Sequence, residues 1–302
     1  MNGWGGIGSA LLLWPGLFGG AALAWLLVWI QRKLAARLQG RRGPPFYQPF
    51  FDFVKLLGKD TVVPAGVNRR LLFALPLISA VAATCALSLI PVPGNTMPSF
   101  PGDLIVLLYL LEMPALCEVL AGYSSRSLYG QVGSAREAIL WLGYNLPFLA
   151  AVVSLAIQAK SLTLAALVAA PLGPVHLAAA AAFLCALPAR LKRNPFSIPN
   201  AEQEIVAGPF TEYSGVPLAC FELSHGLELV ALASLFTVLF LPLANTSALR
   251  WLLYLLGSGA LVGLITLVAT ATARLTVRHA FRFYWSWGAC AAIVALMIAG
   301  MW

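Results

Sequence analysis

Long apolar runs are the feature that most limits how this chain can fold. About 20 apolar residues of helix cross a bilayer core, and eight runs of about that size occur. They lie near residues 5–30, 71–92, 103–123, 136–159, 162–189, 216–243, 248–272 and 281–301. The runs are continuous and rich in leucine and alanine rather than alternating, so they predict helices and not the strands of a membrane barrel.

Composition supports an integral membrane protein. The 302 residues are 60% hydrophobic and 10% charged, whereas soluble proteins carry about 25% charged residues. The apolar content covers the whole length, so a single transmembrane domain over residues 1–302 is expected. We predict an all-α fold, a polytopic bundle of about eight transmembrane helices plus a short amphipathic interfacial helix. No lysine or arginine precedes Arg32, which argues against a cleaved signal peptide.

Basic residues predict the orientation of the bundle. The odd-numbered connections, near 31–70, 122–137, 190–215 and 272–282, hold 17 of the 19 lysines and arginines. Because cationic loops remain in the cytoplasm, these connections are predicted to be cytoplasmic and both termini to lie outside, in a multi-pass protein of the cell (inner) membrane. The net charge of +8 largely reflects this asymmetry, so no nucleic-acid partner is expected.

Acidic residues are few and concentrate in residues 190–228. Five of the eleven lie there, namely Glu202, Glu204, Glu212, Glu222 and Glu228. Glu222, His225 and Glu228 follow one another at i,i+3 spacing in the sixth run, so each adjacent pair can touch. Such a row can pass protons because histidine titrates near neutral pH. The alternative is a satisfied polar cluster that only packs helices.

Further carboxylates lie in or next to the third and fourth runs. Glu112 and Glu118 are in the third run, and Arg136 and Glu137 begin the fourth. An ionisable side chain at mid-membrane costs about 2.5–3.5 kcal/mol, so a water-linked or functional role is expected for Glu112 and Glu118. Glu137 has the alternative reading of a carboxylate favoured by a helix start.

Two cytoplasmic segments are candidate docking surfaces. After Pro49, apolar residues recur at helical spacing around Asp52 and Lys55, which predicts a short amphipathic helix at the interface. It serves either as a surface anchor or as a ledge for a partner subunit. Arg274 and Arg278 continue to Arg282 at i,i+4 spacing, which suits lipid headgroups, an acidic partner or an ordinary basic flank.

Motifs for bound cofactors are absent from the sequence. The five cysteines are scattered singly without a CxxC pair, so neither an iron–sulfur cluster nor a structural zinc is expected. No GxGxxG, Walker or HExxH pattern occurs, so nucleotide binding and zinc hydrolysis have no motif.

Four segments, in collinear order over about residues 30–287, resemble one known family. They are RRGPPFYQPFFDFVKLLGKD, AGYSSRSLYGQVGSARE, NPFSIPNAEQEIVAGPFTEYSG and ATARLTVRHAFRFYWSW. The family comprises subunit 1 (the H-type subunit) of respiratory complex I and the matching membrane subunit of energy-converting (group 4) [NiFe]-hydrogenases. AEQEIVAGPFTEYSG followed by LACFELSHGLEL is closer to the hydrogenase branch. Complex I has acids at or near the positions of Asn145, Ser197 and His225, so its proton route does not transfer directly.

The resemblance implies a non-catalytic subunit without a redox centre of its own, in a membrane-bound oxidoreductase complex. It docks hydrogenase large and small subunits, which carry the [NiFe] centre and iron–sulfur clusters, beside antiporter-like membrane subunits. It links electron transfer to proton or sodium movement. The implied coupling residues are Glu202, Glu204, Glu212, Glu222, His225, Glu228, Glu112, Glu118, Arg136 and Glu137. The implied docking residues are Arg41, Arg42, Asp52, Lys55, Arg274 and Arg278.

Three alternatives remain at this point. The H-type subunit of a quinone-reducing, complex I-like NADH dehydrogenase would bind quinone. A stand-alone secondary transporter predicts an inverted repeat, which the sequence does not contain. A purely structural anchor would use its carboxylates only for pairing.

Overall fold

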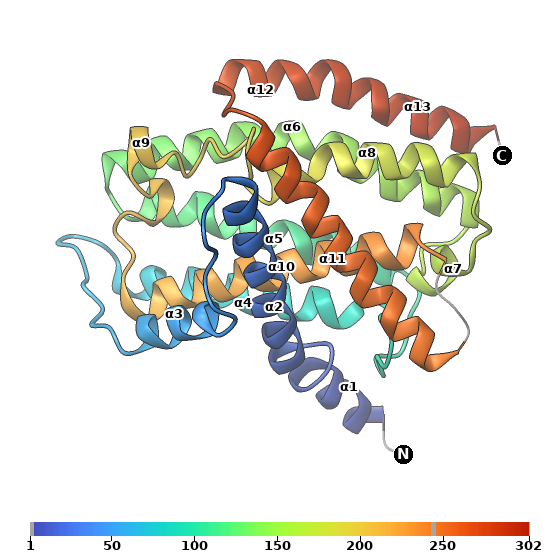
Figure 1. The fold of residues 1–302 in the computed structure, drawn as a ribbon, viewed down its shortest axis with the longest axis horizontal. Helices are drawn as coiled ribbons and strands as arrows, with labels where there is room; N and C mark the ends of the chain where they lie inside the picture. Colours follow the sequence, from blue (N-terminus) through green and yellow to red (C-terminus); the bar gives the residue numbers. More distant parts are fainter. Residues whose placement is uncertain (1–2, 243–245, 302) are drawn as a thin grey trace.

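All regular secondary structure is helical in the residues that the computed structural model describes, 3–242 and 246–301 (Figure 1). No strand occurs within those ranges, so the predicted all-α class is confirmed. Seven helical segments in them are long and apolar enough to cross a membrane. The chain is therefore a multi-span membrane protein.

The membrane-length segments follow most of the predicted runs. The first, Gly6–Leu38, contains α1 (Gly3–Leu12) only in part and all of α2 (Leu17–Leu38). The next four are α4 (Arg69–Leu89), α5 (Asp103–Ser124), α6 (Leu128–Ala159) and α10 (Gly215–Phe240). The last two are α11 (Ser247–Ala271) and the segment Val277–Gly300, which joins α12 (Val277–Phe283), a π-helical turn (Tyr284–Gly288) and α13 (Ala289–Gly300).

The predicted run 162–189 is divided into two helices. Pro171, Gly173 and Pro174 separate α7 (Leu164–Ala169) from α8 (Pro174–Arg190), because proline lacks the N–H that would continue a helix. At 1.5 Å per residue, the 17 residues of α8 extend about 25 Å. The fifth predicted span is thus shorter than the seven membrane-length segments.

The fourth span begins earlier than the sequence predicted. Its helix starts at Leu128 rather than near 136, so most of the expected loop 122–137 is helical. Gly133 brings α6 against a 3₁₀ turn (Gly208–Phe210), where an added Cβ would lie 2.6 Å from Pro209 Cδ. The small residues therefore serve close packing and not loop flexibility.

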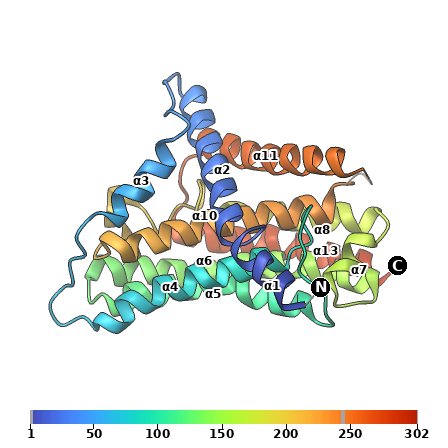
Figure 2. The ribbon, with the colours of Figure 1, turned by 90° about the horizontal axis from the view of Figure 1, so that it is seen from below.

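Helix α10 lies at the centre of the bundle. In it, 83% of the membrane-length window is buried, against 28% for the segment Val277–Gly300. Helices α4, α5, α6, α8 and α13 run roughly alongside it, whereas α2 and α11 cross the set at an angle (Figures 1 and 2). The hydrophobic core includes buried apolar residues from the roughly parallel helices and from the crossing helices α2 and α11.

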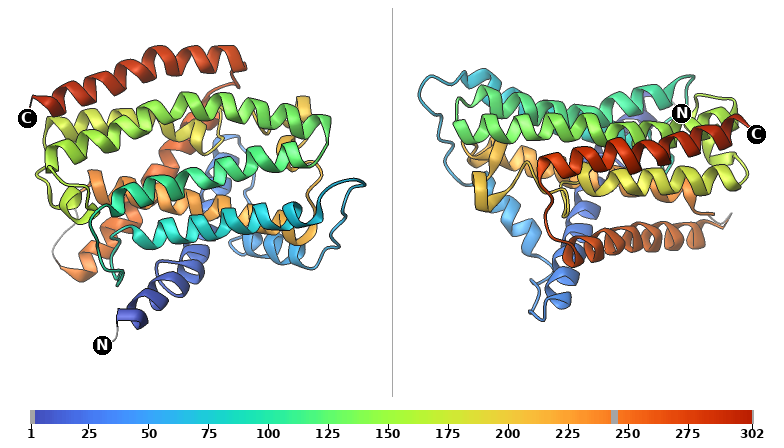
Figure 3. Two further views of the ribbon diagram at one scale, coloured as in Figure 1. Left: turned by 180° about the vertical axis from the view of Figure 1, so that it is seen from behind. Right: turned by 90° about the horizontal axis from the view of Figure 1, so that it is seen from above.

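Odd-numbered and even-numbered connections gather at opposite ends of the bundle (Figure 3). At one end the backbone N–H of Val62 donates to Ser214 Oγ at 3.0 Å, which joins the first and fifth connections. At the other end Trp14 Nε1 donates to the carbonyl of Pro93 at 2.8 Å. This alternation agrees with the predicted topology, and which end faces the cytoplasm stays a prediction.

The predicted amphipathic helix is α3 (Gln48–Leu57). Aromatic contacts hold it against α2, with ring centroids 4.9 Å apart for Trp25 and Phe50. Phe53 of α3 also contacts Trp25, whereas Phe51, Val54 and Leu57 are exposed. This outward apolar face is typical of an interfacial helix.

Two short elements complete the described fold. Helix α9 (Glu202–Ile205) and the 3₁₀ turn lie in the fifth connection, between α8 and α10. This connection thereby brings its own backbone over the end of the bundle where the charged residues gather.

Candidate functional site

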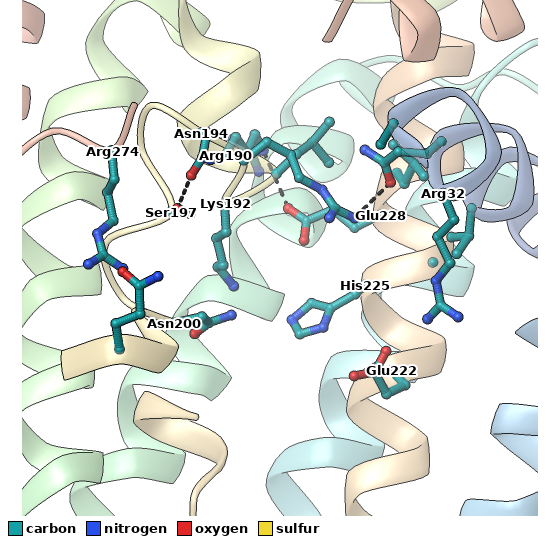
Figure 4. Close-up of a pocket in the computed structure, with 18 residues that line it drawn as sticks. Arg32, Arg190, Lys192, Asn194, Ser197, Asn200, Glu222, His225, Glu228 and Arg274 are labelled. Carbon is teal, nitrogen blue, oxygen red and sulfur yellow. Dashed lines mark hydrogen bonds and ion pairs between the residues drawn. The ribbon is translucent and has the colours of Figure 1, made fainter. Parts of the chain in front are cut away.

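A cavity of about 870 Å³ opens at the end of the bundle where the odd-numbered connections meet. Helices α2, α8 and α10 and the fifth connection form its walls, and Arg274 closes one side (Figure 4). Its charged lining consists of Arg32, Arg190, Lys192, Arg193, Arg274, Glu222, His225 and Glu228. Asn194, Ser197, Asn200 and Gln203 add neutral polar groups.

The first ion cluster centres on Glu118 and is named the Glu118 cluster. This α5 carboxylate is fully buried, with one oxygen 2.6 Å from His225 Nε2 and the other in contact with Lys192 Nζ. Burial alone lowers the pKa of Lys192, but the adjacent Glu118 and Glu137 charges outweigh it and raise that pKa above its ordinary value. Lys192 therefore stays charged beside Glu118.

The second cluster centres on the buried guanidinium of Arg190, at the end of α8, and is named the Arg190 cluster. Arg190 donates to Glu112 Oε1 at 2.7 Å and to the carbonyl of Leu111 at 2.5 Å. Its Nε lies 3.5 Å from Glu228 Oε1. The guanidinium also stacks over the Phe148 ring at 4.3 Å. One cation thus links carboxylates of α5 and α10.

Neutral donors complete the environment of Glu112. Asn145 Nδ2 donates to Glu112 Oε2 at 2.8 Å, and Trp141 Nε1 contacts the same oxygen. Asn145 therefore occupies a position beside a partly buried carboxylate although it carries no charge itself.

Glu137 is fully buried on α6 between the clusters and Tyr144. Tyr144 Oη donates to one carboxylate oxygen at 3.3 Å, and the other oxygen has no hydrogen-bond partner within the described chain. The carboxylate interacts electrostatically with Lys192, Glu118 and Glu228. An oxygen of this kind is a place for a proton or an ordered water.

The predicted row on α10 is arranged differently from the expectation. His225 turns to Glu118 and Glu228 turns to Arg190, while Glu222 is exposed to the cavity. Among the contacts of residues 3–242 and 246–301, none joins Glu222 directly to His225 or His225 to Glu228. Tertiary packing against α5 and α8 therefore selects the partners.

A surface ion triad, the Glu204 latch, holds α9 in place. Glu204 accepts from Arg136 of α6 at 2.6 Å and from Arg274, which follows α11, at 2.8 Å. The hydrogen bond from Arg136 is the largest influence on Glu204 and, with Arg274, lowers its pKa. Arg274, assigned to docking from the sequence, thus pairs within the chain.

The other predicted residues are spread over the same end of the molecule. Glu212 is half-buried before α10, and the side chain of Glu202 lies outside the described residues. Asp52 pairs with Arg32 at 2.7 Å. Exposed side chains are those of Arg41, Arg42, Lys55 and Arg278.

The residues predicted from the sequence did not include two cations of the site, Arg190 and Lys192. Arg190 and Lys192 counted only as flanks of an apolar run, yet they are the counterions of the buried carboxylates. A usable signal exists, because buried acids require partners and three cations lie within residues 190–193.

No metal site is apparent in the described ranges, where no group of three or more His, Cys, Asp or Glu residues gathers. All five cysteines are free, with Cys117 buried and Cys290 exposed on α13. The titratable groups of the two clusters are carboxylates and an imidazole, which can hold and exchange protons.

Known proteins are similar to this chain in both sequence and fold. A family model described as NADH dehydrogenase matches residues 13–300. An H-type subunit of NADH-quinone oxidoreductase from Syntrophobacter fumaroxidans is 33% identical over 301 residues, covering 93% of this chain and 91% of that protein. Hydrogenase-4 component C of Escherichia coli is 34% identical over 237 residues, covering 74% and 73%.

A solved structure extends the likeness to three dimensions. A chain of the membrane-bound sulfane sulfur reductase, an archaeal respiratory membrane complex, superposes with a TM-score of 0.88 at 28% identity. The match covers 98% of this chain and 99% of that one. This chain therefore belongs to the NADH dehydrogenase family of membrane subunits, whose members include the H-type subunits of NADH-quinone oxidoreductase and hydrogenase-4 component C.

Proposed function

We propose that this chain is the membrane anchor and coupling subunit of an energy-converting [NiFe]-hydrogenase complex. The supporting observation is the pair of ion clusters that open on one cavity. Arg190, Lys192 and His225 line the cavity and contact Glu112 and Glu118, which are not among its lining residues. Such an arrangement suits protons (or sodium ions) that enter from a docked partner's side and pass into the bundle.

The redox chemistry belongs to partner subunits in this proposal. The hydrogenase large and small subunits supply the [NiFe] centre and iron–sulfur clusters, and antiporter-like subunits extend the membrane part. This chain binds no cofactor and contributes carboxylates, an imidazole and buried cations. The two relatives are named as a subunit of NADH-quinone oxidoreductase and a component of hydrogenase-4, and the structural neighbour is described as a respiratory membrane complex, which supports such partners.

The lining of the cavity favours the hydrogenase over a quinone reductase. Apolar side chains come only from Val28, Ala35, Leu191 and Leu229 among the residues that line it, and the remainder are charged, polar or glycine. Pockets for apolar ligands are lined mainly by hydrophobic and aromatic groups. A quinone with an isoprenoid tail fits this cavity less well than water and protons do. The likeness to hydrogenase-4 component C agrees with this choice.

The alternative is the H-type subunit of a quinone-reducing, complex I-like NADH dehydrogenase. The NADH-quinone oxidoreductase relative from Syntrophobacter fumaroxidans, which matches over 93% of this chain, supports it. The two candidates differ in the electron acceptor and not in the fold, so a measurement on the intact complex separates them.

The test is purification of the complex from native membranes through a tag on this chain. We expect stoichiometric nickel and hydrogen formation from a low-potential donor, with no sensitivity to quinone-site inhibitors. A complex without nickel that reduces quinone, and that such inhibitors block, would contradict the proposal and select the alternative.

A further inference from the structure

A second, smaller cavity lies beneath the amphipathic helix. It measures about 330 Å³ and runs between α2, α3 and α10. Its inner wall is apolar, with Trp25, Phe53, Leu56 and Leu223 among the lining residues. The dimensions and the wall suit part of an acyl chain, because apolar chains gain free energy when they leave water for such surfaces.

The rim of this groove is cationic. Lys55 on α3 and Lys59, two residues after the end of α3, line the groove and are exposed. Neither forms an ion pair within the described parts of the chain, whereas Arg32 is already paired with Asp52 at 2.7 Å. Two unpaired ammonium groups beside an apolar groove complement an anionic headgroup that carries acyl chains.

The position of α3 places both features at the membrane surface. Phe51, Val54 and Leu57 are exposed on the face of α3 that turns away from the bundle, which is the face an interfacial helix presents to lipid. Trp25 and Phe50 in contact hold the helix at that level. A phospholipid beside α3 therefore has its phosphate at the height of the lysines.

We propose that the groove between α2, α3 and α10 binds one anionic phospholipid. Its phosphate lies on Lys55 and Lys59, and an acyl chain fills the apolar wall beneath α3. Glu222 lines both the groove and the large cavity, and Asp52, the other acid that lines the groove, is paired with Arg32.

The lipid has a structural consequence for the large cavity. The two cavities share Val28, Arg32, Glu222 and Gly226 as lining residues, so the groove is a lateral opening towards the charged site. A bound acyl chain closes that opening and keeps the Glu118 and Arg190 clusters separate from the membrane interior.

Native mass spectrometry of the intact complex tests the site. Wild type is expected to retain one phosphatidylglycerol or cardiolipin through delipidating washes. Lys55→Gln/Lys59→Gln is expected to retain it about 30-fold more weakly, because each cation near an anionic lipid surface contributes a factor of about five. The matched control is Arg69→Gln/Arg70→Gln, which removes two exposed cations at the start of α4 outside the groove.

Competition identifies the source of the phosphate. Phosphatidylglycerol vesicles are expected to restore the lipid to a washed complex, whereas phosphatidylcholine vesicles and soluble glycerol phosphate are not. Equal retention in the lysine and control variants would overturn the site. So would recovery of a quinone in place of a phospholipid, or displacement of the lipid by glycerol phosphate.

Discussion

At the scale of single residues, the site depends on buried acids that share few cations. Glu118 contacts both His225 and Lys192, so its loss leaves Lys192 without this counterion and His225 without this hydrogen-bond partner. Removing one partner of a buried pair is strongly destabilising, by about 3–5 kcal/mol, because the remaining charge is uncompensated. The Glu118 cluster is therefore expected to be sensitive to the loss of this acid.

Glu118→Gln is expected to lower ion translocation per turnover at least tenfold in vesicles that contain the complex. Hydrogen formation should fall less, since the redox centres are proposed to lie in other subunits. Asp60→Asn is the matched control, because Asp60 is exposed and outside the clusters. Unchanged translocation in Glu118→Gln would show that the cluster only packs helices.

Glu204 gives a prediction about pH. Arg136 and Arg274 lower its pKa below the ordinary value of 4.5, so the latch contributes stability above that value and loses it as the pH falls through the lowered pKa. The contribution is small because the side chain is 47% exposed. A nitroxide on Gln203→Cys should become mobile only below about pH 4.5, as electron paramagnetic resonance measures.

The Glu204→Gln background supplies the control for this measurement. The label should be mobile at all pH values there, because the neutral amide cannot titrate or pair with the arginines. A mobility change at the same pH in both backgrounds would assign the transition to a different group.

At the scale of the elements, close packing of α6 against the fifth connection positions the site. The hypothetical Cβ of Gly133 would lie 2.8 Å from Gly208 Cα and 2.9 Å from Pro209 N, which are backbone atoms that cannot easily move. Helix α6 carries Arg136, Glu137 and Asn145, so this contact sets the register of three site residues.

Gly133→Ala is therefore expected to lower the thermal stability of the complex in detergent and to separate the 3₁₀ turn from α6. Gly259→Ala is the matched control, since an added Cβ meets nothing within 4 Å there. Alanine favours a helix interior over glycine by about 1 kcal/mol, so this control should be neutral or slightly stabilising. Equal melting temperatures of the two variants would contradict the packing argument.

The sequence predicts the elements well and their partners poorly. Apolar runs determine most spans, and proline and glycine spacing explains the break between α7 and α8. The predicted start of the fourth span, near 136, was wrong. Glycine and serine between residues 122 and 137 are typical of loops, whereas in the structure they allow close contact between neighbouring segments. Which cation reaches Glu112 or Glu118 depends on the packing of helices distant in sequence, and no local pattern encodes that choice.

At the scale of the whole molecule, the two ends of the bundle carry different chemistry. The Glu118 and Arg190 clusters and the Glu204 latch lie near the odd-numbered connections, whereas Trp14, Pro93 and Trp251 pack at the other end. A partner with redox centres would therefore meet the charged end.

Reporter fusions test the predicted orientation. Alkaline phosphatase is expected to be active when fused after Met301 and inactive when fused after Arg126, because positive loops remain in the cytoplasm. A fluorescent protein at the same two positions should give the opposite pattern. Phosphatase activity at Arg126 would place the charged end outside the cell and exclude the proposed docking of a cytoplasmic arm.

Arg190 and Lys192 belong to one short stretch of chain, two residues apart, at the start of the connection that the Glu204 latch restrains. Their acids, by contrast, are fixed on α5 and α10. This short stretch therefore carries the central cation of the Arg190 cluster and a cation of the Glu118 cluster. A displacement of this segment by a docked protein alters the potential at Glu112, Glu118 and Glu228 simultaneously, so the two clusters respond as one unit.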